Sequence, residues 1–132
     1  MLLLIGDCTI CLTQSSGHLY SPSYPTYYLP NKQCSWNITV PLGHVIRLHF
    51  IDFDLEESSF CNKDFVSVYD WKRKWKLAGR FCGRRYPEFV QSNGNRMLVR
   101  FTSNSNIQRT GFKAQYKAVK GRLRSRDGLI MR

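Results

Sequence analysis

Hydrophobic residues alternate with polar residues in several short runs of the chain. Two of these runs, residues 46–50 and 65–69, lie on either side of an acidic segment. Further runs of this kind occupy residues 34–40, 77–83, 97–101 and 112–117. A period of two residues is typical of a β-strand that is buried on one face, and no segment has a helical period. The pattern therefore predicts short strands at these positions.

The segments between the runs are rich in turn-forming residues. Residues 17–28, GHLYSPSYPTYY, contain two prolines and are interpreted as a tyrosine-rich loop. Residues 41–43 form a turn, residues 71–76 a polar connection, and residues 86–95 a loop that ends in the turn signal SNGN. Short strands separated by frequent turns predict an all-β domain, a sandwich of two mostly antiparallel sheets.

Length and charge set the frame for this domain. The chain has 132 residues, enough for one domain, and 20 Lys and Arg residues against 9 Asp and Glu residues give it a net charge of +11. No apolar run approaches the length of a membrane span. Residues 1–7 are interpreted as a leader stub or a disordered N-terminus, with a first strand at residues 3–5 as the alternative. The arginine-rich residues 120–132 are interpreted as a flexible basic tail or linker, or as a proprotein cleavage region.

Five cysteines are many for a chain of this length. Cys8 and Cys11 form a single CxxC pair with no second pair, and the histidines do not follow zinc spacing, so disulfides in an oxidising compartment explain the count better. The sequon at Asn37 agrees with this compartment. If Trp36 and Ile38 face the core, Asn37 points outward, where a glycan must be. The sequence thus predicts a secreted or extracellular domain, glycosylated at Asn37.

Acidic residues are concentrated around the turn between the two central runs. Six of the nine lie there: Asp52, Asp54, Glu56, Glu57, Asp64 and Asp70. Like charges at close range repel, so either water screens these carboxylates or a cation holds them.

Basic residues are concentrated in the segment that follows. Four of them alternate with two tryptophans in WKRKWK, and three arginines come shortly after; the predicted basic face comprises Lys72, Arg73, Lys74, Lys76, Arg80, Arg84 and Arg85. Clustered bases with aromatic residues suit sulfated glycans, acidic proteins or phosphate-rich partners. A solvated loop with Trp75 packed on the sheet is the alternative. Nucleic acid suits the same chemistry but not an extracellular compartment, and is not expected as a partner.

The order of short motifs resembles one domain family. SGHLYSPSYP, CSWNITVPLGHVIRLHFIDFDLE, NKDFVSVYD, LAGRFCG, MLVRFTSNSN and TGFKAQY follow each other as in a CUB domain, over residues 8–119. The resemblance implies a β-sandwich of two mostly antiparallel sheets, an extracellular location, and a module of a larger protein.

The resemblance also implies the disulfide pairing. In the family the first cysteine lies nine residues before the glycine of the SG turn, which fits Cys8 and not Cys11. The implied bridges are Cys8–Cys34 and Cys61–Cys82. Cys11 is then free and buried, or paired with a disulfide-linked partner, or it replaces Cys8.

A calcium-binding subset of the family resembles this chain at the acidic turn. There a tyrosine, a glutamate and two aspartates surround Ca²⁺, and the corresponding residues here are Tyr28, Glu56, Asp64 and, in place of the second aspartate, Asn104, followed by Ser105 or Asn106. Asn104 lowers the charge of the site, and calcium affinity follows that charge. The alternative is that Glu56 and Asp64 pair with bases or backbone N–H groups, and that Tyr28 is a packed aromatic.

These patterns favour a binding module over an enzyme, because the chain contains no nucleophile motif and no metal-spaced histidine pair. The resemblance implies a calcium-stiffened module whose loop end binds an extracellular protein through an exposed lysine of that partner. One alternative is a calcium-independent adhesion domain that binds sulfated glycans through the basic face. Another is a non-catalytic module of a larger extracellular protease.

Overall fold

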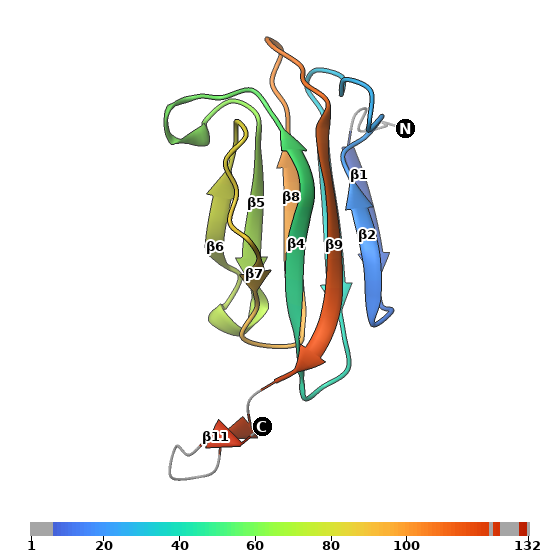
Figure 1. Ribbon diagram of the computed structural model, residues 1–132, viewed down its shortest axis with the longest axis vertical. Helices are drawn as coiled ribbons and strands as arrows, with labels where there is room; N and C mark the ends of the chain where they lie inside the picture. The colour runs from blue at the N-terminus through green and yellow to red at the C-terminus, as the bar shows by residue number, and fades with distance from the viewer. Residues whose placement is uncertain (1–6, 122, 125–129, 132) are drawn as a thin grey trace, which may run out of the picture.

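The computed structural model describes residues 7–121, 123–124 and 130–131. The domain is a sandwich of two β-sheets (Figure 1). The strands are β1 (Asp7–Leu12), β2 (Ser16–Tyr20), β3 (Gln33–Thr39), β4 (His44–Asp54), β5 (Phe65–Asp70), β6 (Lys76–Phe81), β7 (Val90–Gln91), β8 (Arg96–Thr102), β9 (Gly111–Lys120), β10 (Leu123–Arg124) and β11 (Ile130–Met131), and two short 3-10 turns are η1 (Ser59–Cys61) and η2 (Trp71–Arg73). Within these described ranges no helix has the length and apolar character of a membrane span.

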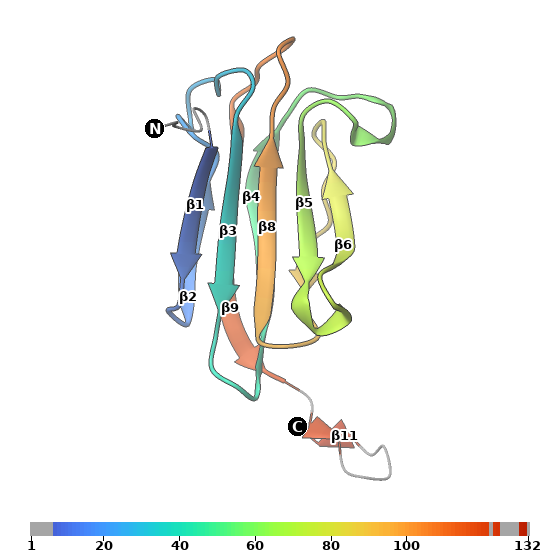
Figure 2. The same cartoon turned by 180° about the vertical axis from the view of Figure 1, so that it is seen from behind.

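The two sheets have different strand orders. The first contains five strands in the order β1-β3-β8-β5-β6, and the second contains four in the order β2-β9-β4-β7 (Figure 2). Strand β1 runs parallel to β3, whereas the other neighbouring strands of both sheets pair antiparallel. The prediction of an all-β sandwich with two mostly antiparallel sheets is therefore confirmed.

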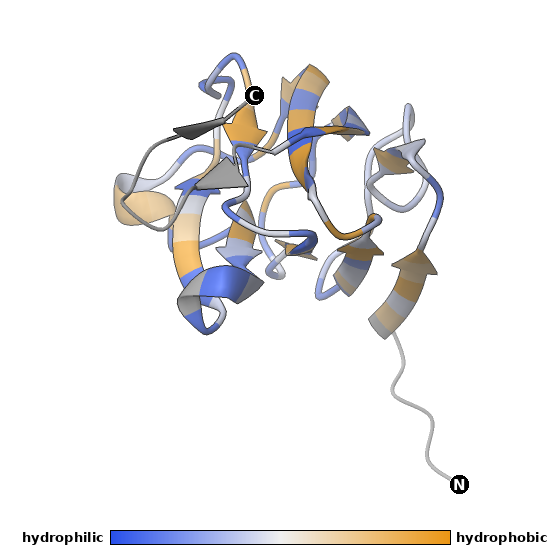
Figure 3. Cartoon of the chain, turned by 90° about the horizontal axis from the view of Figure 1, so that it is seen from below, coloured by the Kyte–Doolittle hydropathy of each residue, from blue (hydrophilic) through white to orange (hydrophobic). Residues whose placement is uncertain are grey.

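Alternating side chains of both sheets fill the core. The stripes of hydropathy along the strands follow this alternation (Figure 3). Trp36 and Ile38 of β3 are buried, and Trp36 packs edge-to-face on Phe112 of the opposite sheet, with ring centroids 5.6 Å apart. Burial of this alternating set fixes the register of each strand, because a one-residue slip would turn its apolar side chains to solvent.

The structure corrects the loop predicted at residues 17–28. Its first part is strand β2, which pairs with β9. Only Leu19 of that strand is buried, so the segment has no apolar period to reveal it. The loop predicted at residues 86–95 likewise contains the short strand β7, and β1 was not predicted.

Both predicted disulfides are present, Cys8–Cys34 and Cys61–Cys82. Cys11 is free and exposed, so two of the alternatives for it, that it is buried and that it replaces Cys8 in the bridge, are wrong. The predicted leader lies almost wholly outside the described residues, as does much of the predicted tail. Within the tail, β9 extends to Lys120, and β10 pairs with β11.

Three loops from distant parts of the chain meet at one end of the sandwich. Residues 21–32 connect β2 to β3, residues 55–64 connect β4 to β5, and residues 103–110 connect β8 to β9. They lie together at the top of Figure 1, and we call this part of the molecule the loop end.

Candidate functional site

Four of the residues implied as calcium ligands meet at the loop end. Tyr28 comes from the first loop, Glu56 from the second, and Asn104 from the third, while Asp64 immediately precedes β5. Strands of both sheets deliver these loops, so the site depends on the sandwich being closed.

A close contact between two loops positions Tyr28. Ser21 Oγ accepts a hydrogen bond from the Phe112 N–H at 2.9 Å, and the Tyr28 N–H donates to the Arg109 carbonyl at 3.0 Å. Gly111 has φ +92°, and a Cβ there would collide with Ser21. Glycine at this position thus permits both the backbone conformation and the close approach.

Asp64 is the centre of the hydrogen-bond network. Its Oδ2 accepts from the Tyr28 hydroxyl at 2.6 Å, and its Oδ1 accepts from the Asn104 N–H at 2.7 Å. The Tyr28 oxygen in turn accepts from the Glu56 N–H at 3.2 Å. The Asp64 side chain therefore ties all three loops together.

The two carboxylates are buried without a basic partner. Asp64 is 0% exposed and Glu56 4% exposed. The only ion pair among the residues that the structure describes joins Arg84 to Asp54, and Glu56 Oε1 is buried with no hydrogen-bond partner there. A buried carboxylate that lacks a partner is costly, and a bound cation removes this cost.

Tyr28 supplies a neutral oxygen to this cluster. Burial, together with the hydrogen bond to Asp64, raises the pKa of Tyr28 well above the usual value for tyrosine. The phenol therefore stays protonated at neutral pH. Its ring also packs edge-to-face on Phe101, with centroids 5.1 Å apart. Tyr28 is therefore a packed aromatic residue, as the alternative expected, but its hydroxyl also contacts the cluster.

Asn104 enters the cluster through its backbone. Its N–H contacts Asp64, whereas its side-chain Oδ1 accepts from the Asn106 N–H at 3.0 Å. Ser105 and Asn106 are exposed. Across the described part of the chain, no three His, Cys, Asp or Glu residues form a metal-binding cluster. The side-chain oxygens that the structure brings together here thus come from two carboxylates and one phenol.

The other acidic residues have different environments. Asp70 lies at the opposite end of β5, where it accepts from the N–H and Nδ2 of Asn93 at 2.9 and 2.7 Å. Asp52 accepts from the Tyr24 hydroxyl, and the charge of Asp54 is paired with Arg84. The acidic segment of the sequence therefore separates in space, and Glu56 and Asp64 are its two members in the cluster.

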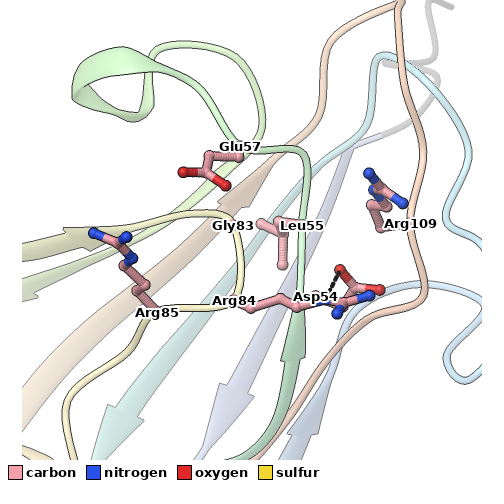
Figure 4. Close-up of a pocket in the computed structure, with 7 residues that line it drawn as sticks. All are labelled: Asp54, Leu55, Glu57, Gly83, Arg84, Arg85 and Arg109. Carbon is pink, nitrogen blue, oxygen red and sulfur yellow. Dashed lines mark hydrogen bonds and ion pairs between the residues drawn. The ribbon is translucent and has the colours of Figure 1, made fainter.

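A pocket of about 370 Å³ lies beside the cluster (Figure 4). It is lined by Asp54, Leu55, Glu57, Gly83, Arg84, Arg85 and Arg109. Arg84 Nε lies 3.3 Å from Asp54 Oδ1, and the Glu57 carboxylate lies on the other side of the pocket. Sequence reasoning missed Arg109, because it stands alone in a polar loop. The pocket gives the loop end a rim of mixed charge.

The residues of the predicted basic face do not form one cluster. Lys72, Arg73 and Lys74 lie in and beside η2, at the end of the sandwich opposite the loop end. Arg84 and Arg85 follow the far end of β6, whose six residues separate the two groups by about 20 Å. Asn37 is partly exposed on the outer face of the five-stranded sheet, and its glycosylation stays a prediction.

Comparison with known proteins assigns the family. The profile of the CUB domain matches residues 8–116. The chain belongs to the CUB domain family. This CUB domain is 41% identical over 115 residues to procollagen C-endopeptidase enhancer 2 of Homo sapiens, a match that covers 87% of the chain but 28% of that protein. The chain thus spans less than a third of this curated relative.

Two solved structures are also similar to this domain. The full extracellular region of zebrafish Gpr126/Adgrg6 aligns with a TM-score of 0.80 at 38% identity, over 89% of this chain and 15% of that one. The MASP-1 CUB2 domain bound to Ca²⁺ aligns with a TM-score of 0.74 at 28% identity, over 82% of this chain and 96% of that one. The second of these relatives binds calcium.

Proposed function

We propose that this CUB domain is an extracellular protein-interaction module whose loop end is ordered by Ca²⁺. The observation that carries the proposal is the burial of Glu56 and Asp64 without a cationic side chain, with Glu56 Oε1 unpartnered among the described residues. Hard oxygen donors of this kind suit Ca²⁺. The calcium-bound MASP-1 CUB2 domain supports the choice of ion.

In this proposal Glu56, Asp64, Tyr28 and Asn104 hold the ion, with Ser105 or Asn106 beside them. The bound ion neutralises the two buried carboxylates and fixes the three loops relative to each other. Asn104 stands in place of a second aspartate, so the site carries one negative charge fewer than it would with that aspartate. We therefore expect a calcium affinity at the weak end of extracellular calcium modules, roughly 10⁻⁴–10⁻³ M. Pre-ordered loops then lose less entropy when a partner binds.

The proposed partner is an extracellular protein that presents a lysine to the loop end. Exposed Glu57 lies beside the cluster and offers a carboxylate at its rim. The domain itself acts as a non-catalytic module, in a larger protein or in an extracellular protease. The alternative, calcium-independent adhesion to sulfated glycans through the basic residues of 72–85, predicts strong salt dependence and no effect of chelators. A disulfide-linked partner is a further proposal for exposed Cys11.

Thermal melts of the disulfide-intact domain test the calcium site. Melts are recorded in EDTA, in about 10 mM CaCl₂ and in MgCl₂ at the same concentration. Ligand linkage predicts about 1.4–2.7 kcal/mol of stabilisation by Ca²⁺ at these affinities. The proposal predicts this gain for Ca²⁺ and not for Mg²⁺, whose small size demands a near-ideal octahedral site. Equal midpoints in EDTA and CaCl₂ contradict it.

A further inference from the structure

The outer face of the five-stranded sheet carries three arginines that each stack on aromatic rings. The guanidinium carbon of Arg80 lies 4.2 Å from the Phe65 ring centroid, and that of Arg100 lies 5.8 Å from the Tyr69 centroid. The guanidinium carbon of Arg96 lies 5.3 Å from the Trp71 centroid and 5.5 Å from that of Trp75. We call these seven side chains the arginine face. Figure 2 shows this side of the sandwich with no other element across it.

Strand register sets the spacing of the arginines. Arg100 pairs with Ser67 on β5, and Ser67 pairs with Arg80 on β6, so the two arginines lie two strands apart in one row. Two strands correspond to about 10 Å, and the four residues from Arg96 to Arg100 on β8 correspond to about 13 Å. The three charges therefore form a triangle on one flat surface.

These charges are not neutralised within the sheet. On strands β3, β8, β5 and β6, the side chains that point outward from the sheet include no acidic residue. These outward side chains are Gln33, Ser35, Asn37 and Thr39 of β3, Arg96, Leu98, Arg100 and Thr102 of β8, Phe65, Ser67 and Tyr69 of β5, and Leu77 and Arg80 of β6. The one ion pair in the described ranges, Arg84–Asp54, lies elsewhere. The arginines are thus free to pair with an external anion.

Stacking prepares the arginines for such an anion. A guanidinium held over a ring loses less rotamer freedom on binding and keeps its planar fork for bidentate contacts. Arg100 Nε also donates to Ser35 Oγ at 3.2 Å, which fixes its position further. Between Arg100 and Arg80, Ser67 is 0% exposed and its Oγ has no partner among the described residues. An anionic oxygen seated between the two guanidinium groups would complete that hydroxyl's hydrogen bonding.

We propose that the arginine face binds a linear sulfated polysaccharide. A sulfated chain carries anions along its whole length and matches separated charges on a flat surface. An acidic peptide would gain main-chain hydrogen bonds only at a free strand edge, and the centre of this face has none because β8 and β5 are paired on both sides. The proposal is independent of the calcium site, which lies at the loop end.

Binding to an immobilised heparin oligosaccharide tests the proposal. The variant Arg80→Gln/Arg96→Gln/Arg100→Gln is compared with Lys113→Gln/Lys117→Gln/Lys120→Gln, which removes the same charge from β9 of the other sheet. If each surface arginine contributes about two- to threefold to the affinity for heparin, the loss of all three should weaken binding roughly tenfold or more. The lysine variant should lose less than about threefold. Equal losses would show that net charge alone drives binding and would overturn the proposal.

Conservative variants and a second probe sharpen this test. Arg80→Lys/Arg96→Lys/Arg100→Lys keeps the charge but loses the planar fork, so it should bind heparin several-fold more weakly than the wild type. If this variant binds with the affinity of the wild type, the proposal that the stacked guanidinium groups form a specific site is overturned. Tighter, arginine-dependent binding of poly-glutamate than of heparin overturns the choice of a polysaccharide. Circular dichroism and the single variant Arg100→Lys guard against misfolding. Tryptophan fluorescence should change on heparin binding, since Trp71 and Trp75 stack on Arg96.

Discussion

The substitution Glu56→Gln should stabilise the calcium-free domain and weaken its response to calcium. Glu56 is 4% exposed, and its Oε1 has no partner among the described residues. Glutamine keeps the shape but removes the buried charge, whose unsatisfied state costs about 1–3 kcal/mol. We therefore expect the variant to be about 1 kcal/mol more stable than the wild type in EDTA.

In calcium the same variant should lose most of its advantage. The wild type gains about 1.4–2.7 kcal/mol from 10 mM CaCl₂, which corresponds to a rise of about 4–13 °C in the melting midpoint of a domain of this size. Loss of one charged ligand weakens the site, so the calcium-induced rise of Glu56→Gln should be less than half of that of the wild type. Differential scanning calorimetry in both buffers measures the two changes.

Glu57→Gln is the matched control, because Glu57 is the exposed neighbour of Glu56. It should leave both midpoints nearly unchanged, within about 0.5 kcal/mol. Two results would refute the reasoning. One is a wild-type calcium response in Glu56→Gln, which would place the ion elsewhere. The other is a loss of stability in EDTA, which would mean that Glu56 makes a favourable contact in the calcium-free domain.

Three further predictions concern neighbouring residues. Asn104→Asp should bind Ca²⁺ about tenfold more tightly by calorimetric titration, because the added carboxylate raises the charge of the site, and unchanged affinity would exclude Asn104 from it. Burial raises the pKa of Tyr28 above 10.0, so the wild type should lose stability as the pH rises above 10, where the unfolded chain releases the phenol proton; its advantage over Tyr28→Phe should shrink between pH 8 and pH 11, and a constant gap contradicts this. Cys11 should be the one thiol of the native domain that reacts with a thiol reagent, and Cys11→Ser should abolish the reaction at a cost within about 0.5 kcal/mol; two reactive thiols would refute the bridges.

Alternation along the chain predicted the strands that contribute several residues to the core. Strands β3, β4, β5, β8 and β9 were found in this way, because each buries alternate side chains. Strand β2 buries only Leu19, and β7 has two residues, so neither produces a period. The assignment of β4 and β5 to opposite sheets was also beyond the sequence, since a period of two does not say which sheet a strand joins.

The candidate site was predictable in membership but not in geometry. Motif resemblance named Tyr28, Glu56, Asp64 and Asn104, and the structure brings them together. The contact of Asn104 through its backbone depends on loop conformation, which side-chain identity does not determine. The arginine face was predicted only in part, since Arg80, Trp71 and Trp75 belong to the predicted basic segment whereas Arg96 and Arg100 were missed. Arg96 and Arg100 alternate visibly in RMLVRFT, but their aromatic partners come from β5 and the segment after it, and only the pairing of β5 with β8 brings them side by side.

The parallel pairing of β1 with β3 favours the Cys8–Cys34 disulfide over a bridge from Cys11 to Cys34. Cys8 faces Cys34 directly in the register, and Cys8 and Leu12 pack against the core. If Cys11 bonded to Cys34 instead, β1 would shift by three residues. An odd shift turns the strand over, so that Leu12, which packs against the core, would face solvent. The pleat of β1 therefore favours the Cys8–Cys34 bridge over a Cys11–Cys34 bridge, because the second would move an apolar side chain from the core to solvent.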